Sequence, residues 1–131
     1  MKALLLAAGL GTRLRPITDK IPKCLVEVGQ EKMIDRWITA CLEADVREIF
    51  INVHYLADVV KDHLAATYFG PYIKILEEPN LLGTAGTIRK IADQVGDEHL
   101  LVVHVDNWTD LSLKDFLLDY ELRCPAECGL G

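Results

Sequence analysis

The sequence predicts an α/β fold in which a doubly wound, mostly parallel sheet has helices on both faces. Two almost wholly apolar runs, residues 2–8 and 99–105, are typical of strands that are buried on both sides, as parallel strands are. Between these runs, residues 33–42 and 84–95 carry apolar side chains at helical spacing. Strands that alternate with helices in this way indicate successive right-handed βαβ units.

Three shorter segments complete the predicted strands. They are residues 24–28, 48–53 and 72–76. In a sheet of this kind, ligands bind at the carboxyl ends of the strands, where the strand order reverses. This rule singles out the loops that follow the strands, at residues 9–18, 77–87 and 106–110.

Each predicted helix has one apolar stripe that faces the sheet. In the helix over residues 56–66, the inward side chains are Val59, Val60 and Leu64. In the helix over residues 84–95, they are Ile88, Ile91, Ala92 and Val95. A last helix begins near Ser112, with Asp115 as its capping partner and Asp110 as a second candidate cap. Its inward side chains are Leu113, Phe116, Leu117 and Tyr120.

The composition predicts one compact domain. A chain of 131 residues, of which 50% are hydrophobic, suffices for a single core. No apolar run approaches the roughly 20 residues that a membrane span needs, and the amino terminus lacks an export signal. We therefore expect a cytoplasmic protein without a membrane partner. The net charge of -6 argues against nucleic acid as a partner.

Positive charge is concentrated near the start of the chain. Five of the 14 basic residues fall within the first 23 positions: Lys2, Arg13, Arg15, Lys20 and Lys23. On an acidic protein, such a cluster is either a local anion site or a solvated basic stretch.

The cysteines lack the spacing of a disulfide framework, and we expect reduced, structural thiols. They are Cys24, Cys41, Cys124 and Cys128. The last two form a C-x-x-x-C pair, but a zinc site needs two further ligands, which the neighbouring sequence does not offer.

The loop after the first strand has glycines at positions 9 and 11. Such glycines let backbone amides approach phosphate oxygens closely. Arg13 and Lys23 add a planar guanidinium and a point charge, both of which suit phosphate groups. A dinucleotide fingerprint would need a third glycine at Leu14, and a Walker loop would need Gly-Lys-Ser/Thr. Their absence excludes a Rossmann-like oxidoreductase and a P-loop enzyme.

The whole segment 6–25, with Pro22 and Lys23 near its end, closely resembles the signature of the sugar-1-phosphate nucleotidyltransferases. The resemblance extends to residues 32–34, to residues 78–86 and to the strand that ends at Asp106. Within this family, the sequence resembles the mannose- and hexose-1-phosphate guanylyltransferases in particular. The resemblance implies a Rossmann-like, truncated three-layer nucleotidyltransferase fold. Residues 1–131 would be its nucleotide-binding half, without the half that binds the acceptor sugar.

The resemblance also implies partners and roles. The partners would be a nucleoside triphosphate, a sugar 1-phosphate and Mg²⁺, and the product a nucleotide sugar. Asp106 would bind the metal, Lys23 the substrate phosphate and Arg13 the departing pyrophosphate, although Val105 stands where the family usually has glycine. The implied nucleotide-binding residues are Leu6, Ala7, Gly9, Gly11, Thr12, Arg13, Lys23, Glu78, Gly83 and Thr84. Positioning and charge neutralisation suffice for this chemistry, so no side-chain nucleophile is expected.

The family position that reads the base edge falls on Glu78. A carboxylate only accepts hydrogen bonds, which suits the neighbouring N1-H and N2-H₂ of guanine and predicts GTP as the donor. The alternative is that Glu78 faces solvent. Gly83, nearby, either contacts the nucleotide or simply permits a turn.

Two further expectations concern assembly and activity. The strand over residues 99–105 would lack a neighbour, so we expect a homo-oligomer formed through this edge, with exchange of the last helix between subunits as one route. The resemblance puts a second metal-binding aspartate beyond residue 131, so this chain would turn over poorly. A non-catalytic, nucleotidyltransferase-like binding or regulatory subunit is the alternative, but the presence of Arg13, Lys23 and Asp106 together favours an enzyme.

No catalytic role is predicted for the histidines or the tryptophans. His104 interrupts an apolar strand and is predicted to be a core histidine. No role is assigned to His54, His63, Trp37 or Trp108, although Trp108 is near enough to Asp106 in the sequence to line a site.

Overall fold

The computed structural model describes residues 1–124. Its main sheet has four strands in the order β5-β4-β1-β6, and all neighbouring pairs are parallel. The strands are β1 (Lys2–Leu6), β4 (Ile49–Val53), β5 (Ile73–Glu77) and β6 (Leu100–His104). After β1, the chain adds β4 and then β5 on one side of it, and β6 is then added on the other side. This is the doubly wound, Rossmann-like arrangement, and the predicted fold class is confirmed.

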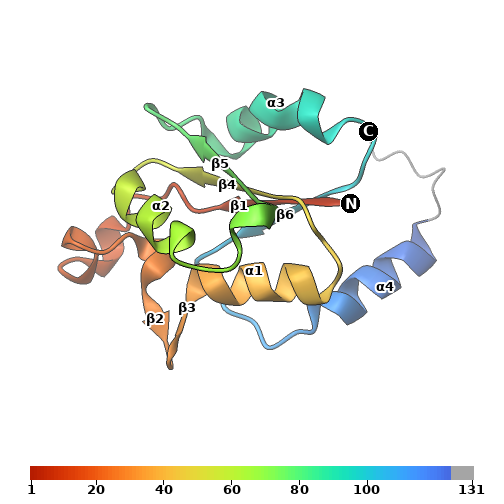
Figure 1. The fold of residues 1–131 in the computed structure, drawn as a ribbon, viewed down its shortest axis with the longest axis horizontal. Coiled ribbons are helices and arrows are strands. Elements are labelled where there is room, and N and C mark those ends of the chain that lie inside the picture. Colours follow the sequence, from red (N-terminus) through yellow and green to blue (C-terminus); the bar gives the residue numbers. More distant parts are fainter. Residues whose placement is uncertain (125–131) are drawn as a thin grey trace.

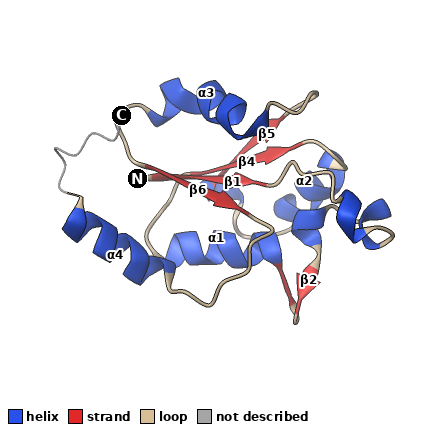
Figure 2. Cartoon of the chain, turned by 180° about the vertical axis from the view of Figure 1, so that it is seen from behind, coloured by secondary structure: helices blue, strands red, loops and turns tan. Residues whose placement is uncertain are grey.

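Helices cover both faces of the sheet (Figures 1 and 2). Helix α3 (Gly83–Val95) lies alone on one face. The opposite face carries α1 (Met33–Glu43), α2 (Ala57–Ala65) and α4 (Leu113–Arg123). No helix within residues 1–124 is both long enough and apolar enough to cross a membrane.

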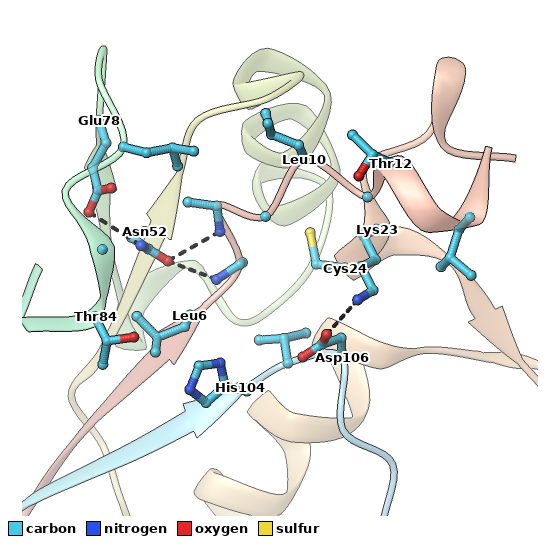
Figure 3. Close-up of a pocket in the computed structure, with 18 of the residues that line it drawn as sticks. Leu6, Leu10, Thr12, Lys23, Cys24, Asn52, Glu78, Thr84, His104 and Asp106 are labelled. Carbon is cyan, nitrogen blue, oxygen red and sulfur yellow. Dashed lines mark hydrogen bonds and ion pairs between the residues drawn. The ribbon is translucent and has the colours of Figure 1, made fainter. Parts of the chain in front are cut away.

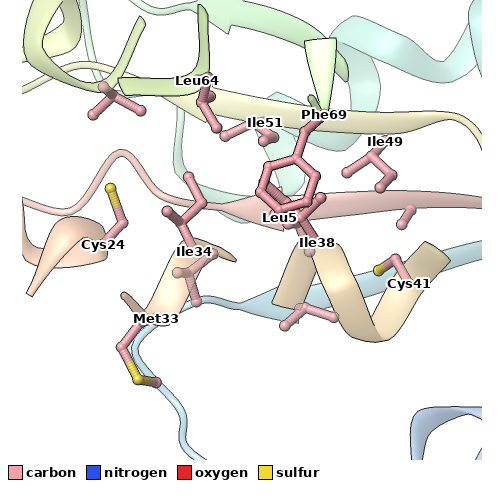
Figure 4. Packing of buried hydrophobic residues seen from close by; sticks show 14 of the residues in the cluster. Leu5, Cys24, Met33, Ile34, Ile38, Cys41, Ile49, Ile51, Leu64 and Phe69 are labelled. Atoms are coloured by element: carbon pink, nitrogen blue, oxygen red, sulfur yellow. The ribbon is translucent and has the colours of Figure 1, made fainter. Parts of the chain in front are cut away.

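The core has two parts because side chains alternate along each strand. Ala3 and Leu5 of β1 face the larger cluster, which includes Ile34 and Ile38 of α1 (Figure 4). Leu4 faces the opposite way, toward the cluster under α3. Complete burial of one such leucine or isoleucine contributes about 1.5–3 kcal/mol, so the alternation fixes which face of each strand meets which helix layer.

The helix stripes are narrower than predicted. Val60, Leu64, Ile91, Val95, Leu113 and Leu117 are buried, as expected. Val59 and Phe116, however, are 41% and 47% exposed, and Ala92 is also exposed. Adjacent residues on a helix point about 100° apart, so Val59 and Val60 do not both face the sheet. Ser112 caps α4 by accepting a hydrogen bond from Asp115 N, and it, not Asp110, is the N-cap residue.

The sequence predicts a strand over residues 24–28, and the structure differs. Lys23–Leu25 forms a 3₁₀ turn, and β2 (Glu27–Val28) pairs with β3 (Glu31–Lys32) in a small antiparallel hairpin outside the main sheet. Cys24 and Leu25 are buried in the core, which anchors the turn, whereas Val28 is exposed. Gly29 adopts a φ of 70° at the tip, where the chain reverses.

Candidate functional site

A cavity of about 440 Å³ opens at the carboxyl ends of the strands (Figure 3). It lies between the loops that follow β1, β5 and β6, together with Asn52 of β4. The strand order reverses at β1, because β4 and β6 flank it on opposite sides. The cavity therefore occupies the place where ligands bind in sheets of this topology.

Every residue that the sequence predicted for the site lines this one cavity. These residues are Leu6, Ala7, Gly9, Gly11, Thr12, Arg13, Lys23, Glu78, Gly83, Thr84 and Asp106. They come from segments that are far apart in the sequence, and the parallel sheet brings them together because its strand ends meet at one edge.

The glycine loop is held in shape by its own contacts. Gly11 has a φ of 65°, and a Cβ there would lie 2.8 Å from Thr18 Cγ2, so only glycine fits. The hydroxyl of the fully buried Thr18 donates to the carbonyl of Gly11. Tyr55, from the loop after β4, donates its hydroxyl to the carbonyls of Thr18 and Asp19. The loop is therefore preformed and not an open coil.

Gly9 differs from Gly11, because a Cβ at Gly9 would meet no atom within 4 Å. Nothing in the fold requires glycine there, and the free space belongs to the cavity. We expect Gly9→Ala to leave the melting temperature unchanged and to weaken nucleotide binding by about tenfold, because the methyl group obstructs approach to the backbone.

The control for this prediction is Gly70→Ala, since Gly70 also has open space around it but lies outside the cavity. Calorimetric titration with a nucleoside triphosphate and thermal melts measure both variants. Equal affinities for the two variants would mean that the nucleotide does not approach Gly9.

Lys23 and Asp106 form an ion pair at the rim of the cavity, with Nζ 2.5 Å from Oδ2. The hydrogen bond from Lys23 holds the pKa of Asp106 below its usual value, so the carboxylate is ionised at neutral pH. Arg13 is exposed and forms no ion pair with any residue from 1 to 124. Its guanidinium is therefore available to an anion in the cavity.

Lys2 does not belong to this basic group. It lies at the opposite end of β1, where its ammonium donates to the carbonyl of Gln94 and lies 3.4 Å from Glu48 and from Glu98. The predicted basic cluster thus contains a structural member, and Arg13 and Lys23 are the members that line the cavity.

Glu78 lines the cavity wall, but its side chain points into the protein. It is 1% exposed, so the alternative that it faces solvent is wrong. Its carboxylate accepts hydrogen bonds from Asn52, Thr87 and the amide of Leu82. Because both oxygens already accept from protein groups, the side chain is not presented to a base in this arrangement.

Sequence reasoning missed Asn52, Thr87 and His104. Asn52 is a polar residue in an otherwise apolar strand, and this signal could have identified it. His104 was predicted to be a core residue, but it is exposed and lines the cavity at the end of β6. The alternation along β6 accounts for this, since Val103 and Val105 on either side are buried.

The two tryptophans lie outside the cavity. Trp108, to which the sequence assigned no role, is 55% exposed and does not line the site although it follows Asp106 closely in the sequence. The Arg36 guanidinium stacks on its ring at 5.1 Å. Trp37 donates its indole N-H to the carbonyl of Asn107 at 2.9 Å. This bond fixes the loop that follows Asp106.

The cysteines offer no nucleophile to the site. Cys24 lines the cavity, but burial raises the pKa of its thiol to about 12. Burial raises the pKa of Cys41 to about 12 as well. Of the C-x-x-x-C pair, Cys128 lies outside the described residues. Within residues 1–124, no three His, Cys, Asp or Glu side chains cluster as a metal site would require.

A glycine loop at the reversal point of a doubly wound parallel sheet, beside an arginine that forms no ion pair with any residue from 1 to 124, is typical of α/β proteins that bind phosphate-containing ligands. Comparison with known families makes this specific. Residues 2–122 match the nucleotidyl transferase family, and the chain belongs to that family.

Individual relatives support this family membership. The chain is 39% identical over 109 residues to an N-acetylmuramate alpha-1-phosphate uridylyltransferase of Caulobacter vibrioides, covering 80% of this chain and 45% of the relative. It is 44% identical over 97 residues to a mannose-1-phosphate guanyltransferase of Neurospora crassa, covering 72% of this chain and 26% of the relative. A putative glucose-1-phosphate thymidylyltransferase of Bacillus anthracis superposes with a TM-score of 0.80 at 27% identity, covering 93% of this chain and 50% of that one. The chain thus spans half or less of these relatives.

Proposed function

We propose that this protein transfers a nucleoside monophosphate from a nucleoside triphosphate to a sugar 1-phosphate, with release of pyrophosphate. The observation that carries the proposal is that one cavity combines the glycine loop, the pair between Lys23 and Asp106, and Arg13, which forms no ion pair with any of residues 1–124. Relatives named as guanylyl-, uridylyl- and thymidylyltransferases support the reaction type.

In the proposed reaction, a phosphate oxygen of the sugar 1-phosphate attacks the α-phosphorus in line. The bond to the β-phosphate oxygen breaks, and pyrophosphate leaves with that electron pair. Lys23 would offset the charge that develops on the transferring phosphate. The amides of residues 9–13 and the guanidinium of Arg13 would hold the leaving pyrophosphate. The protonated thiol of Cys24 takes no part.

The residues present fit a magnesium ion. Asp106 presents an ionised carboxylate at the cavity rim. Mg²⁺ is usually held by one or two carboxylates together with substrate phosphates, so the lack of a cluster of protein ligands within residues 1–124 is compatible with it. When bound, the ion would neutralise phosphate charge and help to align the reacting groups. Asp106 would then have to loosen its bond to Lys23, which would free the ammonium for phosphate.

We propose GTP as the nucleotide donor, as the sequence predicted, but the support now comes from the relatives. Relatives named as mannose-1-phosphate guanyltransferases recur among the most similar proteins. A relative named as a uridylyltransferase matches as well, and the buried Glu78 carboxylate already accepts hydrogen bonds from Asn52 and Thr87. The proposal therefore rests on the relatives and not on direct readout by this side chain.

The test is pyrophosphate release across a panel of four triphosphates and several sugar 1-phosphates, together with competition binding. GTP is expected to bind most tightly of GTP, UTP, dTTP and CTP. A clear preference for dTTP or CTP would rule out GTP. Tight nucleotide binding without release of pyrophosphate from any pair would favour a non-catalytic, regulatory subunit instead.

We further propose that residues 1–131 are the nucleotide-binding half of the active unit and that they self-associate. Among the strands of the described residues, β6 lies at the edge of the sheet, and beside it lies an apolar groove of about 300 Å³. The groove is lined by Leu101, Val103, Leu113 and the half-exposed Phe116, among others. An unpaired apolar edge favours pairing with a second copy.

Light scattering on the chain is expected to give a dimer or larger species. Phe116→Lys is expected to shift this species toward monomer, because a charge in the groove opposes burial. Leu122→Lys is the control, since Leu122 is 84% exposed on the same helix but does not line the groove. A monodisperse monomer for the unmodified chain would overturn the proposed association.

A further inference from the structure

We propose that Asn52, Glu78 and Thr87 form a buried junction that sets the separation between the two loops of the cavity, and thereby its fit to a nucleotide. One of these loops is the glycine loop after β1, and the other is the loop over residues 78–82 between β5 and α3, which leads into Gly83 and Thr84 of the cavity wall. The proposal rests on the proposed function, since it takes the ligand to be a nucleotide. These are positioning residues, because none of them needs to touch the reacting atoms.

Asn52 connects the glycine loop to the centre of the junction. Its side-chain oxygen accepts from the amides of Ala7 and Ala8 at 2.7 and 3.3 Å (Figure 3). Its amide nitrogen donates to Glu78 Oε1 at 3.2 Å and to Thr87 Oγ1 at 3.3 Å. All four hydrogen bonds are made by a side chain that is only 4% exposed.

Glu78 connects the centre of the junction to the second loop. Oε1 also accepts from the hydroxyl of Thr87 at 2.5 Å, and Oε2 accepts from the amide of Leu82 at 3.3 Å. The next residue, Gly83, begins α3 and lines the cavity. The chain of bonds thus runs from Ala7 on one wall to Leu82 beside the other, through groups that are almost completely buried.

The junction has a direct consequence for ligand binding. The amides of Ala7 and Ala8 point at Asn52, so phosphate oxygens are left with the amides that follow, from Gly9 onward. On the other wall, Glu78 restrains the backbone just before Gly83 and Thr84. A nucleotide that spans both walls therefore depends on the junction, whereas pyrophosphate, which needs only the glycine loop, does not.

The experiment first removes the donor of the hydrogen bond from Asn52 to Glu78, and then restores that bond in the opposite direction. Asn52→Asp retains an acceptor for Ala7 and Ala8 but sets a carboxylate against that of Glu78. We expect the dissociation constant of GTP, or of whichever of the four triphosphates binds most tightly, to rise at least tenfold. Inorganic pyrophosphate should bind within about twofold of its original affinity. Adding Glu78→Gln supplies an amide donor to the carboxylate introduced at position 52, and nucleotide affinity should then return to within about threefold of the original.

Two additional variants guard against a purely structural effect. Thr87→Val removes a single hydroxyl with little change of shape, and it should weaken nucleotide binding several-fold without affecting pyrophosphate. Ile38→Val trims a buried core residue away from the cavity. It should lower the melting temperature and leave both affinities unchanged.

A readout that needs no ligand separates this proposal from the proposed function. The amide of Leu82 should exchange with solvent at least tenfold faster in Asn52→Asp and slow again in the double variant. If the protein binds no nucleotide at all, the proposed function fails, and this exchange pattern still decides whether the junction exists. The proposal is overturned if the two substitutions act additively, if Leu82 exchange is unchanged, or if pyrophosphate affinity falls in step with nucleotide affinity.

Discussion

Replacing Lys23 with alanine is expected to lower kcat/KM by about 10²-fold or more, while the melting temperature changes little. The Lys23 ammonium lies at the cavity rim, where charge would develop on the transferring phosphate. Its side chain is 25% exposed and pairs with Asp106, so its removal leaves no void in the core. Initial rates of pyrophosphate release and thermal melts measure the two effects separately.

A matched control exists on the same protein. Lys61 and Glu77 form an ion pair of the same 2.5 Å length, on the surface and outside the cavity. Lys61→Ala should therefore reproduce the loss of an exposed pair without the loss of turnover. A rate for Lys23→Ala close to that of Lys61→Ala would remove Lys23 from the mechanism.

Lys23→Ala should also shift the titration of Asp106. The hydrogen bond from Lys23 lowers the pKa of this carboxyl in the folded protein, so the substitution should raise it toward its ordinary value. A lowered pKa contributes stability above the unfolded-state pKa, and this contribution is lost as the pH falls through the folded-state pKa. Carboxyl NMR titration is the measurement, and an unchanged pKa would show that the pair does not persist in solution.

The sheet was predictable because its strands leave a strong signal. Residues 2–8 and 99–105 are almost wholly apolar, as two-sided burial requires. The hairpin of β2 and β3 was not predictable, since two-residue strands are too short to show periodicity. Val59 and Phe116 were assigned inward because apolar character alone does not reveal how wide a face the sheet covers.

The part of the site whose residues lie close together in the sequence was predictable. Gly9, Gly11 and Arg13 follow a strand directly, and the parallel topology carries them to the same edge as Asp106. The junction was not predictable in this way. Asn52 bonds to groups 26 to 45 residues away, and those contacts arise only when β1, β4 and α3 pack together. The direction of the Glu78 side chain depends on the same packing.

Asp106→Asn is expected to lower turnover by at least about 10²-fold, equivalent to roughly 3 kcal/mol of barrier. Asp106 and Glu78 are the acidic side chains among the described residues that line the cavity, and Glu78 is buried. Asparagine keeps the shape of Asp106 but removes the charge that would hold Mg²⁺. Rates over a magnesium titration measure the effect, with Asp110→Asn as a control, since Asp110 is exposed and lies outside the cavity.

Nucleotide binding without metal should respond to Asp106→Asn in the opposite direction. The Asp106 carboxylate repels phosphate and also occupies the ammonium of Lys23. With the charge removed, Lys23 is free and the repulsion is gone, so the affinity for nucleoside triphosphate in the presence of a chelator should rise by a few-fold. A purely structural lesion would weaken binding and turnover together. Tighter metal-free binding combined with slower, magnesium-insensitive turnover is therefore the result expected of a metal-binding carboxylate, and retention of both rate and magnesium dependence would exclude that role for Asp106.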